Sequence, residues 1–139
     1  MQRFSTWTVG LLLGLALLAP MRRASAQAYV VVVNEAGPAS LTKDDISRIF
    51  LKKNTQMMPV DQDKEAKVRS AFTKAVLGRP LPAIISYWQQ QIFSGGDSPP
   101  VEKGSDSEVL AFVRGNPKAI GYVAAGTELG AGVRAITVQ

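Results

Sequence analysis

The chain alternates between short, unbroken apolar runs and longer stretches in which apolar residues recur every three or four positions. The first run, Tyr29–Asn34, holds four consecutive valines and no alternating polar residue. Such a run is typical of a strand buried on both faces, in a sheet that helices cover on either side. Glu35–Leu41 contains glycine and proline and predicts a loop. We therefore expect Tyr29–Val33 near the centre of a covered sheet, with its loop leading into a helix.

Four stretches carry apolar residues at helical spacing and predict helices. The first begins with Thr42 and Asp45 at the spacing of a capping box, and the last begins with Ser105 and Glu108 at the same spacing. Gly78 stands where the second helix should be capped at its carboxyl end. The four predicted helices are Thr42–Lys53, Asp63–Leu77, a helix that starts near Pro82 and ends before Gly95-Gly96, and a helix from Ser105 to Asn116-Pro117.

Three further apolar runs predict strands. They are Met57–Val60, Ala119–Ala124 and Val133–Val138. Gly121, inside the second run, indicates a close approach of another part of the chain or a bulge. Asp97–Gly104, with two prolines, predicts a loop. Together these elements predict one α/β domain in three layers, with a mixed, mostly parallel sheet flanked by helices.

The amino-terminal residues predict a secretory signal peptide. Arg3 precedes the apolar run Val9–Leu18, and Ala24-Ser25-Ala26 matches the small-residue pattern of a cleavage site. The apolar run is about half of the ~20 residues that a spanning helix needs, which favours a cleaved signal over a retained anchor. Residues 1–26 are therefore assigned to the signal, and residues 27–139 to one domain of 113 residues with no membrane anchor. A periplasmic or secreted location follows from this assignment.

Charge and composition remove several classes of function. The predicted signal holds three of the 16 basic residues and none of the 11 acidic ones, so cleavage lowers the net charge from +5 to +2. The remaining lysines are dispersed, which does not favour a nucleic-acid surface. The sequence has no cysteine and no histidine. This excludes disulfides, lipid attachment through cysteine, imidazole metal sites and catalytic triads built on histidine.

Three stretches form a more specific pattern in this order. They are Leu-Thr-Lys-Asp-Asp-Ile-Ser-Arg-Ile-Phe-Leu at Leu41–Leu51, Ile-Phe-Ser-Gly-Gly at Ile92–Gly96, and Asn-Pro-Lys-Ala-Ile-Gly-Tyr-Val at Asn116–Val123. Together they resemble the phosphate-binding subunit of bacterial phosphate ABC transporters, and the resemblance covers nearly all of residues 27–139. It implies one lobe of a type II periplasmic binding protein, a small anion (phosphate) as ligand and an ABC permease as partner.

The sequence departs from that family in two ways. Family members have two lobes around a cleft, whereas 113 residues make about one lobe. The family's phosphate loop on this lobe is an arginine followed by a Ser-Gly-Thr turn that opens a helix. The corresponding stretch here, Val60–Glu65, has no such turn and carries two aspartates, which repel a phosphate dianion. None of the family's phosphate contacts therefore transfers residue by residue.

Polar residues at the ends of predicted strands form the candidate ligand site. Asn34 and Gln62 each end a strand and offer amide hydrogen bonds, and Asp61 precedes the helix start. Purely structural roles are the alternatives to ligand binding in this stretch. Asp63 would cap the helix, and Arg69 would be a solvated residue paired with Glu65 four positions earlier. The candidate ligand-binding residues are Asn34, Asp61, Gln62, Lys64, Arg69 and Ser70, of which the last three are the nearest groups able to bind an anion.

Metal and catalytic sites are not expected. Asp61, Asp63 and Glu65 alternate like the opening of a calcium loop, but Ala66 and Phe72 replace the glycine and glutamate that would complete it. The sequence has no Gly-x-Ser-x-Gly elbow and no Gly-rich phosphate loop ending in Lys-Ser/Thr. We therefore expect neither an enzyme nor a bound cofactor.

Two functions from different classes remain. The first is an exported solute-binding protein for phosphate or another small anion, associated with ABC transport. The second is an exported interaction module that keeps the fold without a small ligand and self-associates through the face that a second lobe would cover. The three-part resemblance and the signal favour the first function, and the short length and the absent Ser-Gly-Thr turn favour the second.

Overall fold

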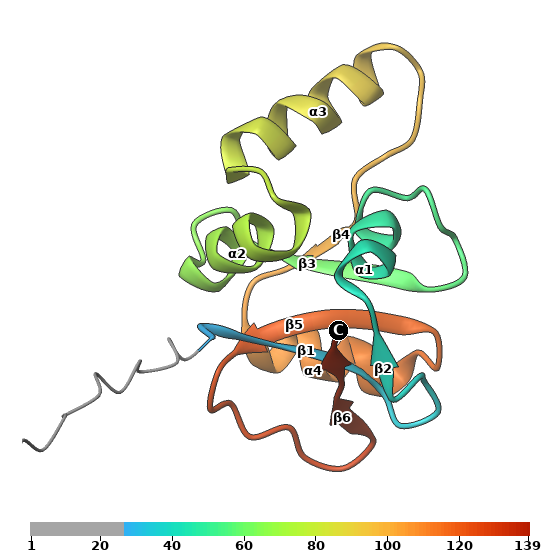
Figure 1. The fold of residues 1–139 in the computed structure, drawn as a ribbon, viewed down its shortest axis with the longest axis vertical. Coiled ribbons are helices and arrows are strands. Elements are labelled where there is room, and N and C mark those ends of the chain that lie inside the picture. Colours follow the sequence, from blue (N-terminus) through green and yellow to red (C-terminus); the bar gives the residue numbers. More distant parts are fainter. Residues whose placement is uncertain (1–26) are drawn as a thin grey trace, which may run out of the picture.

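The computed structural model of the chain describes residues 27–139. The predicted signal peptide and its cleavage site lie outside these residues. In chain order, the elements are β1 (Tyr29–Asn34), β2 (Ser40–Leu41), α1 (Lys43–Phe50), β3 (Met58–Gln62), α2 (Lys67–Phe72), the π-helical turn η1 (Thr73–Leu77), α3 (Leu81–Phe93), β4 (Val101–Lys103), α4 (Asp106–Gly115), β5 (Ala119–Ala124), β6 (Val133–Ala135) and β7 (Thr137–Val138) (Figure 1).

Within residues 27–139, five strands form one mixed sheet in the order β4-β3-β5-β1-β6. β3 pairs in parallel with β4 and β5, whereas β1 pairs antiparallel with β5 and β6. Four of the five strands therefore run in one direction and β1 runs against them. The predicted mixed, mostly parallel sheet is confirmed. β2 and β7 form a separate parallel pair beside it.

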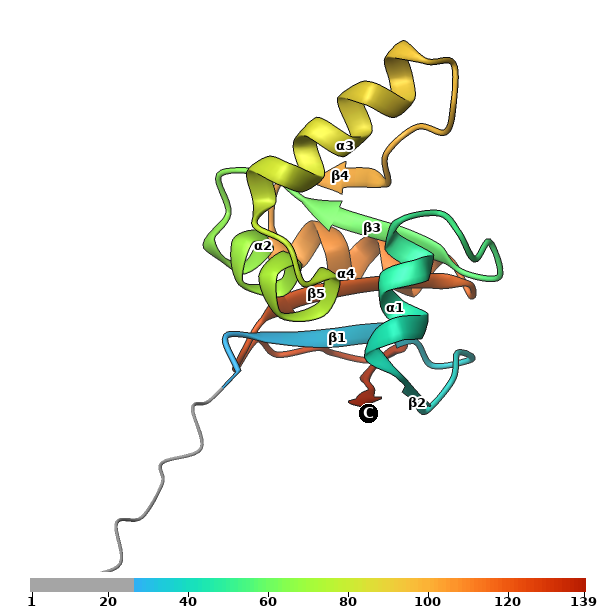
Figure 2. The same ribbon diagram turned by 45° about the horizontal axis from the view of Figure 1, so that its top comes forward.

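Helices cover both faces of this sheet, which confirms the three layers. Figure 2 shows α1 and α2 on the near side and α4 behind the sheet. Successive side chains of a strand point to opposite faces. In β1, Val31 and Val33 accordingly pack in the core under α1, α2 and η1, and Val32 packs in the core under α4. All three valines are buried, as the unbroken apolar run predicts.

Gly121 lets α4 lie close against the sheet. A Cβ atom at this position of β5 would lie 2.7 Å from a methyl group of Val60 and 2.8 Å from one of Val109. Both distances are far below van der Waals contact, so a side chain cannot be added without moving α4 or β3. The close approach predicted at this glycine is confirmed.

Both predicted N-cap residues begin helices where expected, but only Thr42 forms a full capping box, because the Glu108 carboxylate accepts from the Gly104 N–H. Several element boundaries also differ from prediction. α1 starts after Thr42, which exchanges hydrogen bonds with Asp45, and α4 starts after Ser105. The second helix starts at Lys67 instead of Asp63, and the last apolar run divides into β6 and β7. The predicted loop Asp97–Gly104 contains β4, a short edge strand held by its ladder to β3 rather than by an apolar pattern.

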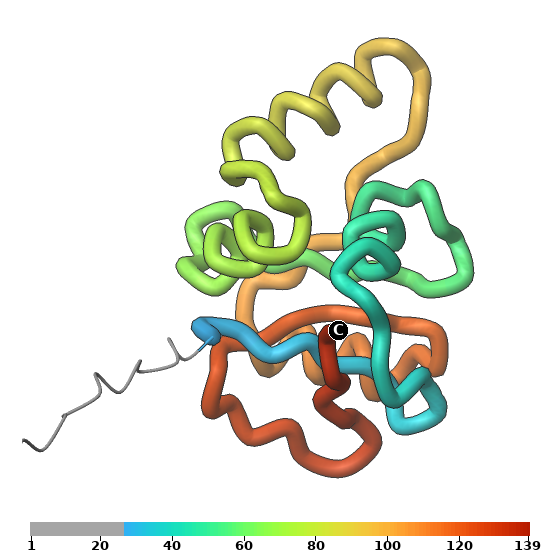
Figure 3. Tube along the Cα trace, viewed as in Figure 1, coloured from blue at the N-terminus to red at the C-terminus, as the bar shows by residue number. Residues whose placement is uncertain are grey.

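α3 extends beyond the layered body of the domain. It is reached from η1 through Gly78 in the left-handed conformation and returns to β4 through residues 94–100 (Figure 3). Its Leu81, Ile84 and Trp88 are buried. No helix within residues 27–139 combines the length and apolar composition needed to cross a bilayer.

Candidate functional site

The carboxyl ends of β3 and β5 mark the edge of the sheet where a ligand is expected. The chain passes from β3 to β4 through α2, η1 and α3. It then passes from β4 through α4 to β5, which lies on the other side of β3 in the sheet. The connections from β3 thus run over one face and the return runs over the other. Ligands of open α/β sheets bind outside the carboxyl ends of the strands at such a reversal. The side chains at this edge therefore define the candidate site.

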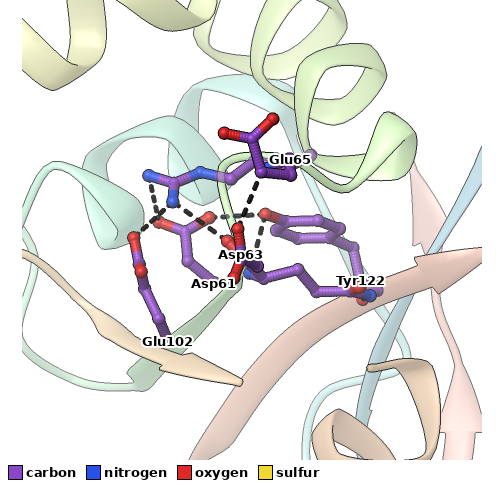
Figure 4. A network of polar contacts seen from close by, with 7 residues as sticks. Asp61, Asp63, Glu65, Glu102 and Tyr122 are labelled. Carbon is purple, nitrogen blue, oxygen red and sulfur yellow. Dashed lines mark hydrogen bonds and ion pairs between the residues drawn. The ribbon is translucent and has the colours of Figure 1, made fainter. Parts of the chain in front are cut away.

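Asp61, near the end of β3, lies at the centre of a buried polar cluster (Figure 4). Its Oδ1 atom accepts a 2.6 Å hydrogen bond from the Tyr122 hydroxyl on β5. Its Oδ2 atom lies 3.6 Å from Nη2 of Arg69 on α2. The cluster thus joins three elements that are distant in sequence.

Arg69 is almost fully buried, at 3% exposure. Its Nη1 atom donates a 2.9 Å hydrogen bond to the Gln62 carbonyl and also pairs with Glu102 on β4. Its Nε atom is buried without a hydrogen-bond partner in the described part of the chain. Because Asp61 and Glu102 both face this guanidinium, its charge is already neutralised by the protein itself.

Burial and charge together shift the pKa values in this cluster. Burial raises the pKa of Asp61, and this outweighs the lowering caused by Arg69 and by the Tyr122 hydroxyl. Burial lowers the pKa of Arg69, but Asp61 and Glu102 raise it by more, so the guanidinium keeps its charge. Burial, followed by the neighbouring Asp61, raises the pKa of Tyr122 above that of an ordinary phenol. The hydroxyl therefore keeps its proton and acts as the donor.

Tyr122 connects this polar cluster to the apolar core. Its ring stacks on Phe72 of α2 with a 4.0 Å separation of centroids and an 11° angle between planes. Its hydroxyl also accepts a 3.1 Å hydrogen bond from the Gln62 backbone N–H. The position of the hydroxyl is thus set from two sides, by the stacked ring and by the end of β3.

Gln62 and Asp106 link the carboxyl ends of β3 and β5. The Gln62 amide donates to Asp106 Oδ1 at 2.7 Å and to the Tyr122 carbonyl at 3.0 Å. The same carboxylate oxygen accepts from the Ala124 N–H at 3.1 Å, where β5 ends. The Asp106 carboxylate therefore accepts hydrogen bonds from both strands at this edge.

The predicted site residues divide into three groups. Asp61, Gln62 and Arg69 come together at the carboxyl edge, whereas Lys64 and Ser70 lie nearby in sequence but are exposed. Asn34 is elsewhere, so its assignment to the site was wrong. β1 runs against β3, which puts its carboxyl end at the opposite edge, where the Asn34 amide donates to the last carbonyls of α4.

The two structural roles predicted for Asp63 and Arg69 also need correction. Arg69 is not a solvated partner of Glu65, because it is buried against Asp61 and Glu102. Asp63 does not cap α2, since Ala66 is the N-cap residue. The Asp63 carboxylate instead accepts a 2.9 Å hydrogen bond from the Glu65 N–H and shapes the loop before the helix.

Sequence reasoning missed Glu102, Tyr122 and Asp106. Tyr122 lies within an apolar run, where a tyrosine is expected to pack rather than to bind a carboxylate. Glu102 lies in a stretch that predicts a loop, and Asp106 carries an ordinary first-turn signature of a helix. Only the pairing of β3 with β4 and β5 brings them to Asp61 and Gln62.

A separate cavity of about 370 Å³ lies at the opposite edge, near the amino ends of β3 and β5. Its polar lining includes Lys52, Asn54, Gln56, Asp97 and Lys118. Residues 27–139 contain no cluster of three or more acidic side chains arranged to hold a metal ion. The two edges of the sheet thus differ, with a closed polar cluster at one and an open, lysine-bearing cavity at the other.

Comparisons with solved structures show which known proteins share this fold. An ABC-type phosphate transport receptor from Vibrio cholerae matches with a TM-score of 0.60 at 20% identity, over 80% of this chain and 46% of the receptor. A putative phosphate ABC transporter substrate-binding protein with bound phosphate from Clostridium perfringens matches with a TM-score of 0.61 at 18% identity, over 80% and 44%. PstS from Borrelia burgdorferi matches with a TM-score of 0.60 at 13% identity, over 81% and 47%.

These likenesses establish that the chain has the fold of phosphate ABC receptors. The chain spans less than half the length of each of these three receptors. No protein-family model matches the sequence, and no curated protein matches it either. The expected single-lobe fold is therefore confirmed, and ligand and partners remain to be argued from the site.

Proposed function

We propose that this chain is an exported solute-binding lobe that binds phosphate or a related small oxyanion and serves ABC-type uptake. The fold supports this proposal, since the solved receptors that share it are described as phosphate transport proteins. The chain would act by binding rather than by catalysis, outside the inner membrane, and would deliver its anion to a permease.

One observation supports a location for the anion. The helix formed by α2 and η1 starts at Lys67 with no side-chain cap and no acidic residue in its first turn. The starts of α1 and α4, by contrast, are capped by side chains and carry acidic residues. Uncapped N–H groups at the positive end of a helix dipole favour an anion. Lys64 in the preceding loop and Lys67 at the helix start, both exposed, supply positive charge there and offset the flanking Asp63 and Glu65.

Arg69 has a positioning role in this proposal. Asp61 and Glu102 occupy its guanidinium, so it does not meet the anion. It instead ties α2 to the end of β3 and to β4, which fixes the helix start relative to the sheet. Of the predicted site residues, Lys64 and Ser70 are exposed and accessible to a ligand, whereas Asp61, Gln62 and Arg69 are buried.

Isothermal titration of the exported chain with phosphate and with sulfate tests the proposal. We expect saturable heat, and a Lys64→Ala variant that binds roughly tenfold more weakly, because it loses a charge-assisted contact. Lys53→Ala, at the other edge of the sheet, is the matched control and should bind as the unchanged chain does. No heat up to millimolar anion would remove the binding function. Weakening by Lys118→Ala but not by Lys64→Ala would move the anion to the cavity at the amino edge.

A second candidate function is an exported interaction module without a small ligand. The observation that favours it is the Asp106 carboxylate at the carboxyl edge of the sheet, held by the Gln62 amide and the Ala124 N–H. A site closed in this way by an internal carboxylate resists a second anion. Genes for a permease and an ATPase beside the gene of this chain would favour uptake, and their absence together with no anion heat would favour the module.

A further inference from the structure

α3 has an exposed surface with no charged residue. No residue from Leu81 to Gly96 is acidic or basic, and the 13-residue helix is about 20 Å long. Leu81, Ile84 and Trp88 are buried on its inner side, whereas Phe93 at its end is 95% exposed. α3 stands clear of the sheet and its covering helices (Figures 1 and 2). The exposed surface of α3 is therefore uncharged, and Ile92, at 59% exposure, adds a second large apolar side chain to it.

Four of the exposed residues on α3 follow the spacing of a helix–helix seam. Ala83, Ser86, Gln90 and Phe93 are all exposed and recur at intervals of three, four and three positions. This is the spacing of the a and d positions of a heptad, through which one helix packs against another. A groove on the same helix is lined by Ser86, Gln90 and Phe93.

The order of residue sizes along this seam suits an antiparallel copy of the same helix. In an antiparallel pair centred on position 88, Phe93 of one copy lies opposite Ala83 of the other, and Gln90 lies opposite Ser86. Each large side chain then faces a small one, which allows the helices to approach and the phenyl ring to be buried. A parallel pair would set the two Phe93 rings against each other and leave the small residues with a gap.

The charges that flank α3 favour the same arrangement. Arg79 precedes the helix and Asp97 follows it, and neither forms an ion pair within residues 27–139. In the antiparallel register centred on position 88, Arg79 of each copy falls at the end where Asp97 of the other copy lies. A parallel pair would instead bring like charges together at both ends.

We propose that two copies of this chain associate through α3, paired antiparallel around a two-fold axis. The surface is self-complementary in charge and in size, which is what an isologous interface requires. Phe93 is the anchor, and the Arg79–Asp97 pairs set the orientation. The interface is small, so we expect a dissociation constant on the order of micromolar. The proposal does not depend on anion binding, because the helix start at Lys67 lies outside the seam.

Sedimentation equilibrium of the exported chain between about 1 and 500 µM tests the association. We expect a monomer–dimer equilibrium that Phe93→Ser weakens roughly tenfold or more, since an interface anchor is lost. Met58→Ser is the matched control, because Met58 is also an exposed apolar residue but lies on β3. A monomer across the whole concentration range overturns the proposal, and so does a dimer whose dissociation constant Phe93→Ser leaves unchanged. Binding of a different protein to α3 would not rescue the proposal in either case.

Charge exchange and crosslinking test the orientation. Arg79→Asp should weaken the dimer and the double variant Arg79→Asp/Asp97→Arg should restore it. The chain has no cysteine, so single cysteines report contacts without interference. A mixture of Ser86→Cys and Gln90→Cys chains should form a disulfide dimer faster than either variant alone. Faster crosslinking of Ser86→Cys with itself would indicate a parallel pair and overturn the antiparallel arrangement.

Discussion

The Tyr122 hydroxyl donates a 2.6 Å hydrogen bond to the Asp61 carboxylate across two neighbouring parallel strands. The pair lies at the carboxyl edge of the sheet, and both residues are buried. The same hydroxyl accepts from the N–H of Gln62, so one oxygen atom joins the end of β3 to the middle of β5. This relationship makes the candidate site part of the structural core, and its variants are expected to change stability first.

Replacement of Tyr122 by phenylalanine should lower the free energy of unfolding by about 1–3 kcal/mol. The ring and its stacking on Phe72 are retained, but Asp61 Oδ1 loses its donor and the Gln62 N–H loses its acceptor. Urea unfolding measures the change. Tyr87→Phe, on α3 and outside this cluster, is the matched control and should leave the midpoint nearly unchanged. Equal effects of the two variants would show that the hydroxyl of Tyr122 contributes nothing specific.

The Asp61 carboxyl should make stability depend on pH. Its pKa is raised in the folded chain, chiefly by burial, so folding takes up a proton between the pKa of unfolded aspartate, about 3.9, and the higher folded value. This contribution is complete below the unfolded pKa and is lost as the pH rises through the folded one. The unfolding free energy of the unchanged chain relative to Asp61→Asn should therefore fall across that range.

Unfolding of both chains in urea from about pH 3.5 to about pH 8 measures this difference. The Asp61→Asn chain is the control, because its amide does not titrate. A difference that grows as the pH rises would show that Arg69 and Tyr122 lower the carboxyl pKa by more than burial raises it, opposite to the expectation.

Removal of the Arg69 side chain should be among the most damaging single changes. Arg69→Ala leaves Asp61 buried without a counter-charge, which costs about 3–5 kcal/mol. The double variant Asp61→Asn/Arg69→Met should be less unstable than Arg69→Ala, because no buried charge is left alone. Equilibrium unfolding of the two variants decides the point. Simple additivity of the separate changes would contradict a direct interaction between these side chains.

The close contact at Gly121 predicts a second stability effect. Gly121→Ala places a Cβ atom against Val60 and Val109 and should cost about 1–3 kcal/mol. Gly115→Ala at the end of α4 is the matched control. A Cβ there meets no other atom within 4 Å and should stabilise the helix by roughly 0.5–1 kcal/mol. Thermal unfolding of both variants should therefore give shifts of opposite sign.

Much of the fold could be predicted from sequence because its signals are local. The valine run of β1 and the N-cap residues of α1 and α4 each act within a few residues. The close approach at Gly121 is also marked by a single residue. The direction of β1 could not be predicted, because an unbroken apolar run looks the same in sequence whether the neighbouring strands are parallel or antiparallel to it. That direction alone separates Asn34 from Gln62.

The candidate site was harder to predict because its contacts join distant segments. Arg69 has the spacing of an ordinary helix-surface residue, and only the placement of Asp61 and Glu102 on adjacent strands explains its burial. Glu102 in turn lies in an edge strand with no apolar alternation. The position of Asp61 and Gln62 at the carboxyl edge of the sheet was easier to predict, because both lie at the end of one strand.

The reversed course of β1 also decides where a reporter group can be attached. Tyr29 pairs with Ala124, so the chain enters the domain beside the carboxyl end of β5. A fluorophore placed just ahead of Tyr29 would therefore sit at the rim of the polar cluster and respond to events there. The Gln139 carbonyl accepts a hydrogen bond from the Lys43 N–H at the start of α1, away from this cluster. A fluorophore attached to Gln139 should therefore not respond to events at the polar cluster and would serve as the reference.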